Sequence, residues 1–110
     1  MLAFVLFSCV TENDTAGATV DCAHAPEVTW DGFAHGFVTT YCVSCHSVNN
    51  TDRRYGAPEG LDFDTEAGLY ESGTRVRERT LVEQSMPPGG GVFADDLQLL
   101  DVYLTCQLGI

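Results

Sequence analysis

The sequence predicts a single all-α domain, and two observations support this class. Apolar residues recur at helical spacing in two segments, at positions 30–41 and 97–106. No segment of useful length shows the alternation of apolar and polar residues that is typical of a strand, and no internal repeat is present. The length of 110 residues corresponds to one domain.

The composition limits the classes of partner. Hydrophobic residues make up 45% of the chain, so it can form a core and is not a disordered acidic tail. The formal net charge is −11, from 16 carboxylates and 5 arginines. This charge argues against binding to nucleic acid or attraction to an anionic membrane surface, because no basic run could neutralise the phosphates. No run of 18 apolar residues is present, so the sequence predicts no membrane span.

The amino-terminal segment predicts an export signal. Residues 1–10 read MLAFVLFSCV, and the end of this apolar run resembles a bacterial lipobox in which Cys9 becomes the lipidated first residue. A plain cleaved signal and a buried apolar segment are the alternatives. Residues 11–20 are small and polar, which is typical of a flexible tether. We therefore expect a signal and tether at 1–20, a folded domain at 21–110, and a location in the periplasm or on the outer face of a bacterial membrane.

The first predicted helix covers residues 29–42. Thr29 is its expected N-cap, and one face carries the apolar residues Trp30, Phe33, Phe37, Val38 and Tyr41. Small residues on the same segment offer a thin surface where another helix could cross closely; they are Gly32, Ala34 and Gly36.

Three further helices are expected downstream. Residues 49–60 are polar and predict a loop, and a short helix capped by Asp64 or Thr65 follows to about residue 71. Ser72-Gly73 is expected to end this helix, and a further helix is expected at 74–84. The PPGGG segment at 87–91 excludes regular structure. Asp95, paired with Gln98 in a capping box, is expected to start the last helix, whose adjacent apolar stripes are Leu97, Leu100 and Leu104, and Leu99, Val102 and Cys106.

The segment CVSCH at 42–46 carries the chemistry. C-x-x-C-H is the attachment signature of c-type haem, in which Cys42 and Cys45 form thioethers with the two vinyl groups and His46 is the proximal iron ligand. Three other uses of this pattern remain open. They are a redox-active dithiol, a zinc site completed by other cysteines or histidines, and a disulfide between Cys42 and Cys45.

Met86 is the predicted second axial ligand. It lies 40 residues after His46 and precedes two prolines, so it is expected on a stiff loop that can hold a thioether across the haem face. The alternative is a core methionine that fills a gap. His24 and His35 compete as ligands, although for both we expect surface or partly buried side chains.

Together these features resemble a small single-haem class I cytochrome c of the bacterial periplasmic or lipoprotein type. The matching pieces are the helix at 29–42, CVSCH, RYGAPEGLDFDT, SMPPGGG and DLQLLDVYLTC, which together span residues 29–106. The resemblance implies that the first and last helices cross at right angles, with Ala34 or Gly36 facing Leu100 or Tyr103. This chain departs from the family in its short stretch between His46 and Met86 and in its two extra cysteines.

The resemblance also assigns residues around the haem. The carbonyl of Pro58, 12 residues after His46, would accept a hydrogen bond from the proximal imidazole. Arg54, or less favourably Arg53, would pair with a haem propionate, and solvated arginines are the alternative.

Two cysteines are left after the haem and lipid sites. In the cytochrome c fold the terminal helices pack together, so the resemblance implies a disulfide between Cys22 and Cys106, which are 84 residues apart. Two free thiols are the alternative.

Ligation by His46 and Met86 would leave no open position on the iron, and no other catalytic constellation is visible. The sequence therefore predicts a monomeric extracytoplasmic electron carrier, not an enzyme, that holds one covalent haem c and docks on redox proteins with basic or polar surfaces. It would meet a membrane only through the lipid anchor. The alternatives are a haem enzyme or gas sensor in which Met86 is displaced, and a partner-binding lipoprotein without catalytic activity.

Overall fold

A computed structural model of the chain describes residues 20–110. The predicted lipidation site at Cys9, the signal and nearly all of the tether lie outside the described residues. The described part contains helices and loops and no strand, so the all-α class is confirmed. No helix in this part of the chain has both the length and the apolar character needed to cross a membrane.

The helical segments join into four helices along residues 20–110. The first combines the π-helical segment η1 (Trp30–Ala34) with α1 (His35–Tyr41), and the second is α2 (Glu66–Glu71). The third combines α3 (Gly73–Arg77) with π-helical η2 (Glu78–Val82), and the last combines α4 (Ala94–Val102) with π-helical η3 (Tyr103–Gln107).

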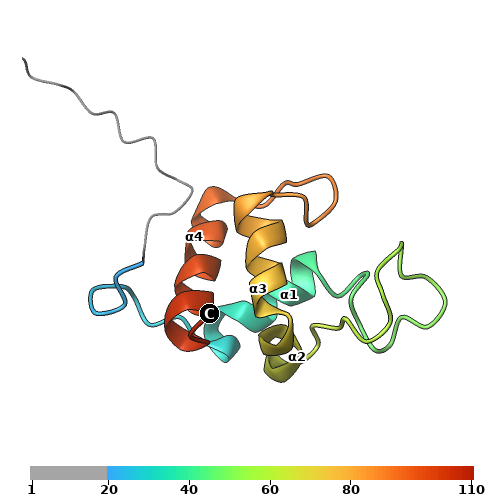
Figure 1. Cartoon of the computed structure of the whole chain (residues 1–110), viewed down its shortest axis with the longest axis horizontal. Coiled ribbons are helices and arrows are strands. Elements are labelled where there is room, and N and C mark those ends of the chain that lie inside the picture. The colour runs from blue at the N-terminus through green and yellow to red at the C-terminus, as the bar shows by residue number, and fades with distance from the viewer. Residues whose placement is uncertain (1–19) are drawn as a thin grey trace, which may run out of the picture.

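Figure 1 shows how these helices are arranged. The helix that contains α3 lies beside the helix that contains α4, and the loop at 83–93 joins their upper ends. The first helix runs obliquely to this pair, and the long loop at 42–65 extends from the helical body on the right of the view.

The helix starts follow local side-chain chemistry, with one exception. Thr29 Oγ1 accepts the Gly32 N–H at 3.0 Å and Thr65 Oγ1 accepts the Gly68 N–H at 3.1 Å, which confirms the first cap and selects Thr65 over Asp64 for the second. The predicted cap at Asp95 is wrong. The last helix begins one residue earlier, at Ala94, because the Phe93 carbonyl already accepts the Leu97 N–H at 3.1 Å. Asp95 therefore lies in the first turn, where its negative charge interacts favourably with the positive end of the helix dipole.

A single core joins the first helix to the last. Ala34, Leu100 and Tyr103 are fully buried in it, which agrees with Ala34 as the small residue that faces the last helix. Gly36 is exposed, so the alternative at Gly36 is wrong. The remaining buried hydrophobic residues are Val28, Phe37, Val38, Phe63, Leu69, Val76 and Leu104. The Tyr103 hydroxyl donates to Glu66 Oε2 at 2.6 Å, and burial together with this bond raises the pKa of Tyr103.

The carboxyl-terminal helix is also fixed covalently and by ion pairing. Cys22 and Cys106 form a disulfide with their Cα atoms 5.5 Å apart, as predicted. On the neighbouring helix, Arg77 donates to Asp101 Oδ1 at 2.5 Å and Thr105 Oγ1 at 2.6 Å. The last helix is therefore attached both to the segment before the first helix and to α3.

The close approach of α2 to the preceding loop yields a stability prediction. A Cβ on Gly68 would lie 2.4 Å from the carbonyl oxygen of Asp62, so backbone must move to admit it. We expect Gly68→Ala to lower the free energy of unfolding by about 1–3 kcal/mol. Gly36→Ala is the matched control, because a Cβ there meets no atom within 4 Å, and it should raise stability by about 0.4–1 kcal/mol. Urea denaturation measures both, and equal midpoints for the two variants would contradict the steric argument.

Candidate functional site

The C-x-x-C-H segment forms a compact turn at the end of α1. The Cys42 N–H still bonds to the Val38 carbonyl at 2.8 Å, and the N–H groups of Cys45 and His46 both turn back to the Cys42 carbonyl, at 3.2 and 2.9 Å. Both thiols are free and partly buried. The turn thus presents two thiols that form no disulfide and an imidazole within five consecutive residues.

Asn50 holds this turn from the following loop. Its side-chain amide donates to the carbonyls of Val43 and Ser44 at 2.9 and 2.7 Å, so both residues between the cysteines are tied to it. Sequence reasoning did not identify Asn50, because an asparagine in a polar loop gives no signal of which carbonyls it will reach.

The His46 ring is oriented by a backbone carbonyl. Its Nδ1 lies 2.8 Å from the carbonyl oxygen of Leu61, and because a carbonyl only accepts, Nδ1 carries the proton. The ring centroid lies 4.9 Å from that of the buried Phe63. Nε2 has no hydrogen-bond partner within residues 20–110 and is not a buried unpaired atom, so its lone pair is accessible.

The structure corrects the prediction for Pro58. The carbonyl that accepts from His46 belongs to Leu61, whereas the Pro58 carbonyl accepts from Arg54 Nη2 at 2.8 Å. The chain reverses between these two residues, with Gly60 at φ 84° and the Leu61 N–H bonded to the Pro58 carbonyl at 3.3 Å. This turn places the carbonyl of Leu61, and not that of Pro58, beside the His46 imidazole.

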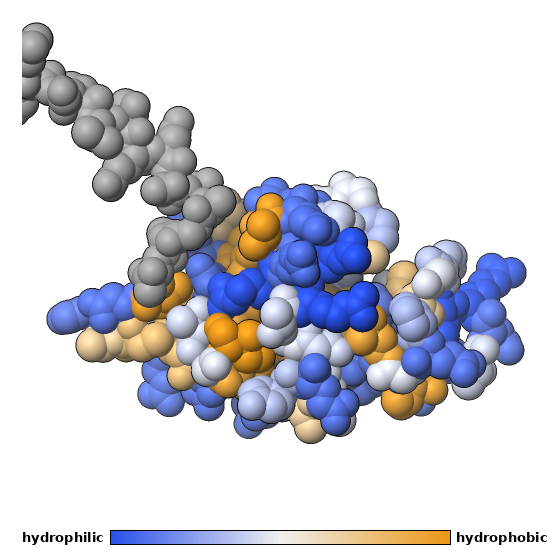
Figure 2. All heavy atoms as spheres, viewed as in Figure 1, coloured by the Kyte–Doolittle hydropathy of each residue, from blue (hydrophilic) through white to orange (hydrophobic). Residues whose placement is uncertain are grey.

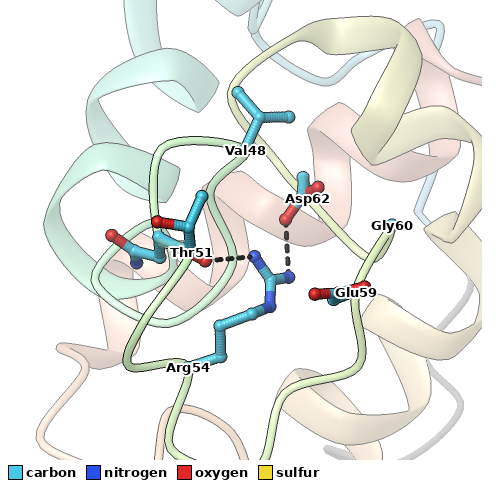
Figure 3. A pocket seen from close by; sticks show the side chains of 7 residues that line it. Val48, Thr51, Arg54, Glu59, Gly60 and Asp62 are labelled. Carbon is cyan, nitrogen blue, oxygen red and sulfur yellow. Dashed lines mark hydrogen bonds and ion pairs between the residues drawn. The ribbon is translucent and has the colours of Figure 1, made fainter.

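The structure also corrects the role of Arg54. Its side chain is 11% exposed and pairs with Asp62 Oδ1 at 2.6 Å. Its other donors reach backbone carbonyls of the same loop, at Ser47, Asn50, Ala57, Pro58 and Leu61. The guanidinium is thus saturated by the protein, which leaves no donor for a propionate. Figure 3 shows this ion pair at the wall of an open pocket of about 260 Å³. Arg53, the weaker candidate, is exposed.

A second contact joins the residues after the C-x-x-C-H turn to the segment before α2. The buried Ser47 hydroxyl donates to Asp64 Oδ1 at 2.6 Å, and the Val48 N–H donates to Asp64 Oδ2 at 2.9 Å. The Ser47 hydrogen bond in particular lowers the pKa of Asp64. This carboxylate stays ionised and anchors the segment that follows His46 directly before the cap of α2.

Met86 lies in the loop after η2, not in the core. The N–H groups of Ser85 and Met86 both bond to the Arg79 carbonyl, at 2.8 and 3.1 Å, which fixes the start of this loop on the helix. The Met86 side chain is 39% exposed, so the alternative of a core methionine is wrong. Two large apolar side chains at the ends of the same loop are also uncovered, Val82 at 64% and Phe93 at 74%.

The two competing histidines lie on the surface, as expected. His35 is exposed and stacks on Trp30 with ring centroids 5.2 Å apart. His24 is exposed and pairs with Asp21 at 2.6 Å.

The arrangement bears on the three other uses of a C-x-x-C pair. Cys42 and Cys45 are not joined to each other. The Cys22–Cys106 disulfide occupies two of the possible zinc ligands, and residues 20–110 contain no cluster of three or more His, Cys, Asp or Glu side chains suited to a metal ion. Burial, with a smaller effect of Cys45, raises the pKa of the Cys42 thiol to about 12, whereas a redox-active dithiol requires a lowered pKa.

Comparisons with known proteins identified no relative of this chain. A scan against models of protein families found no match, and searches of curated proteins and of solved structures found none either.

Proposed function

We propose that this chain is a single-haem c-type cytochrome with the cytochrome c fold, and that it carries electrons. The observation that supports this most strongly is the chemistry of the CVSCH turn. It combines two free thiols with an imidazole whose Nδ1 is bonded to the Leu61 carbonyl and whose Nε2 lone pair is accessible. A histidine that ligates a metal through Nε2 is commonly oriented by such a second bond at Nδ1.

The available donors fit a covalent haem c. Cys42 and Cys45 would supply the two thioethers, His46 the proximal nitrogen and Met86 the distal sulfur. An apolar cofactor beside the loop at 83–93 would cover side chains that are exposed there, including Val82, Met86 and Phe93. When bound, the haem supplies a reversible one-electron couple. Because both axial positions would be taken by the protein, we propose a carrier and not an enzyme or gas sensor.

Covalent attachment is the direct test of this proposal. The full chain, produced in a host that exports proteins and attaches haem, should keep its haem through extraction with acidified acetone and gain the mass of one haem. A variant with Cys42→Ser and Cys45→Ser should lose the haem to the solvent phase. If the unmodified chain releases its haem or never acquires one, the proposed function is wrong.

We further propose that the protein works outside the cytoplasm, held by a lipid on Cys9, and acts as a monomer. Its partner would be a redox protein with a basic or polar docking surface. The net charge of −11 supports this choice, and three of the five arginines are already paired with carboxylates of the chain itself. Hydrophilic residues cover most of the face in Figure 2, with separate hydrophobic residues between them.

This charge predicts that electron transfer depends on salt. The rate with the physiological partner should be highest at low ionic strength and should fall as salt is raised to physiological concentration, because screening weakens long-range attraction. Stopped-flow kinetics over a salt series measures the dependence. A rate that does not change with salt would show that the charge serves only to keep the protein soluble.

A further inference from the structure

The Leu61 carbonyl receives two donors. His46 Nδ1 lies 2.8 Å from its oxygen, and Arg54 Nη2 lies 3.4 Å from the same oxygen. The same Nη2 is 2.6 Å from Asp62 Oδ1, and the side chains of Arg54 and Asp62 are only 11% and 14% exposed. A shielded ion pair is therefore linked to the imidazole through one shared carbonyl group.

This linkage has electronic consequences for the imidazole. The stronger the acceptor at Nδ1, the more electron density a metal-bound histidine passes to its metal. A guanidinium beside the acceptor draws density away from the carbonyl oxygen, and the Asp62 carboxylate opposes that effect by pulling on the guanidinium. Because both charges are mostly shielded from solvent, salt screens them little.

We propose that Arg54 and Asp62 are positioning residues that set the orientation and electron donation of His46, and with them the reduction potential of the haem. This inference rests on the proposed function. The two charges act in opposite directions. Arg54 favours the reduced state of the iron by adding positive charge and weakening the acceptor, and Asp62 favours the oxidised state.

Two substitutions with matched controls test the inference by redox titration of the haem-loaded protein. Arg54→Gln should shift the potential downward, because it frees the carbonyl and leaves the Asp62 charge uncompensated. Asp62→Asn should shift it upward. The controls Arg53→Gln and Asp52→Asn remove the same charges from exposed positions of the same loop, and their shifts should be smaller.

The opposite signs separate this role from a structural one. If Arg54 and Asp62 only hold the loop together, both variants loosen it and the two potentials move in the same direction. That result, or shifts no larger than those of the controls, would overturn the inference. Should Arg54→Gln fail to fold, Asp62→Asn is compared with Asp52→Asn alone, and the inference requires a larger upward shift for Asp62→Asn than for this control.

Failure of the proposed function would be recognised separately. A full chain that carries no haem would refute the cytochrome assignment, and the positioning role would then be measured from the exchange rate of the His46 Nδ1–H proton by NMR. This proton should exchange slowly in the parent chain and in Arg53→Gln, and faster in Arg54→Gln. Equal exchange rates in all three chains would rule out the positioning role whether or not haem is present.

Discussion

Reduced Met86→Ala protein is expected to bind carbon monoxide, whereas the unsubstituted protein is expected to exclude it. Met86 is the single methionine of residues 20–110, the residue is exposed, and its thioether sulfur is the proposed distal ligand. Alanine cannot replace that sulfur, so the sixth position of the iron would open. Absorption spectra of the reduced protein with and without carbon monoxide measure this. The weak sulfur-to-iron charge-transfer band in the far red of the oxidised protein should disappear at the same time.

His35→Ala is the control for this assignment. His35 is exposed and stacked on Trp30, so its loss should leave both the charge-transfer band and the exclusion of carbon monoxide intact. If His35→Ala removes the low-spin spectrum and Met86→Ala does not, the distal ligand is a histidine and the assignment of Met86 is wrong. Carbon monoxide binding by the unsubstituted protein would favour the gas-sensor or enzyme alternative.

Loss of the disulfide is expected to have the largest effect on stability. Cys22 and Cys106 are 84 residues apart. In the chain-entropy account, a crosslink that closes so long a loop stabilises the fold by about 4 kcal/mol, because it restricts the unfolded chain. The double variant Cys22→Ser and Cys106→Ser should therefore unfold at a clearly lower urea concentration. Both cysteines are exposed, so serine removes no buried packing there.

Chemical reduction provides a control without mutation. Thiol reagents cleave a disulfide and leave thioethers intact, so the reduced parent protein should unfold at the same urea concentration as the double variant. Equal midpoints for the oxidised parent and the double variant would contradict the prediction. A difference between the reduced parent and the variant would show that the serines, and not the missing crosslink, change the stability.

The parts of the fold that depend on side-chain pattern could be predicted from the sequence. Thr29 was identifiable as a cap because a hydroxyl before an apolar period has a specific backbone partner, whereas the sequence left Asp64 and Thr65 as alternatives for the second cap. The buried residues Phe37, Leu100 and Leu104 were identifiable by their spacing. The predicted start of the last helix is wrong because its first hydrogen bond uses the backbone carbonyl of Phe93. The type of side chain at a position does not indicate such a bond.

The candidate site was harder to predict where backbone carbonyls are the hydrogen-bond partners of its side chains. Every residue carries a carbonyl, so the choice of Leu61 over Pro58 as the partner of His46 depends on how the loop turns around Gly60. The pairing of Arg54 with a haem propionate is implied only by the resemblance to class I cytochromes c. The actual contacts of Arg54, which join distant points of a loop, arise only when that loop is folded.

The disulfide also determines the topology of the chain. Residues 22–106 form a closed covalent ring, which contains the whole CVSCH segment and Met86. A protease that cuts one peptide bond in an exposed loop, such as the glycine-rich stretch at 89–91, opens this ring without dividing the molecule. Both proposed axial ligands, His46 and Met86, would then lie on the amino-terminal peptide. The disulfide would keep the peptide that carries the last helix attached to it, so a single cut in an oxidising compartment would not release that helix from the protein.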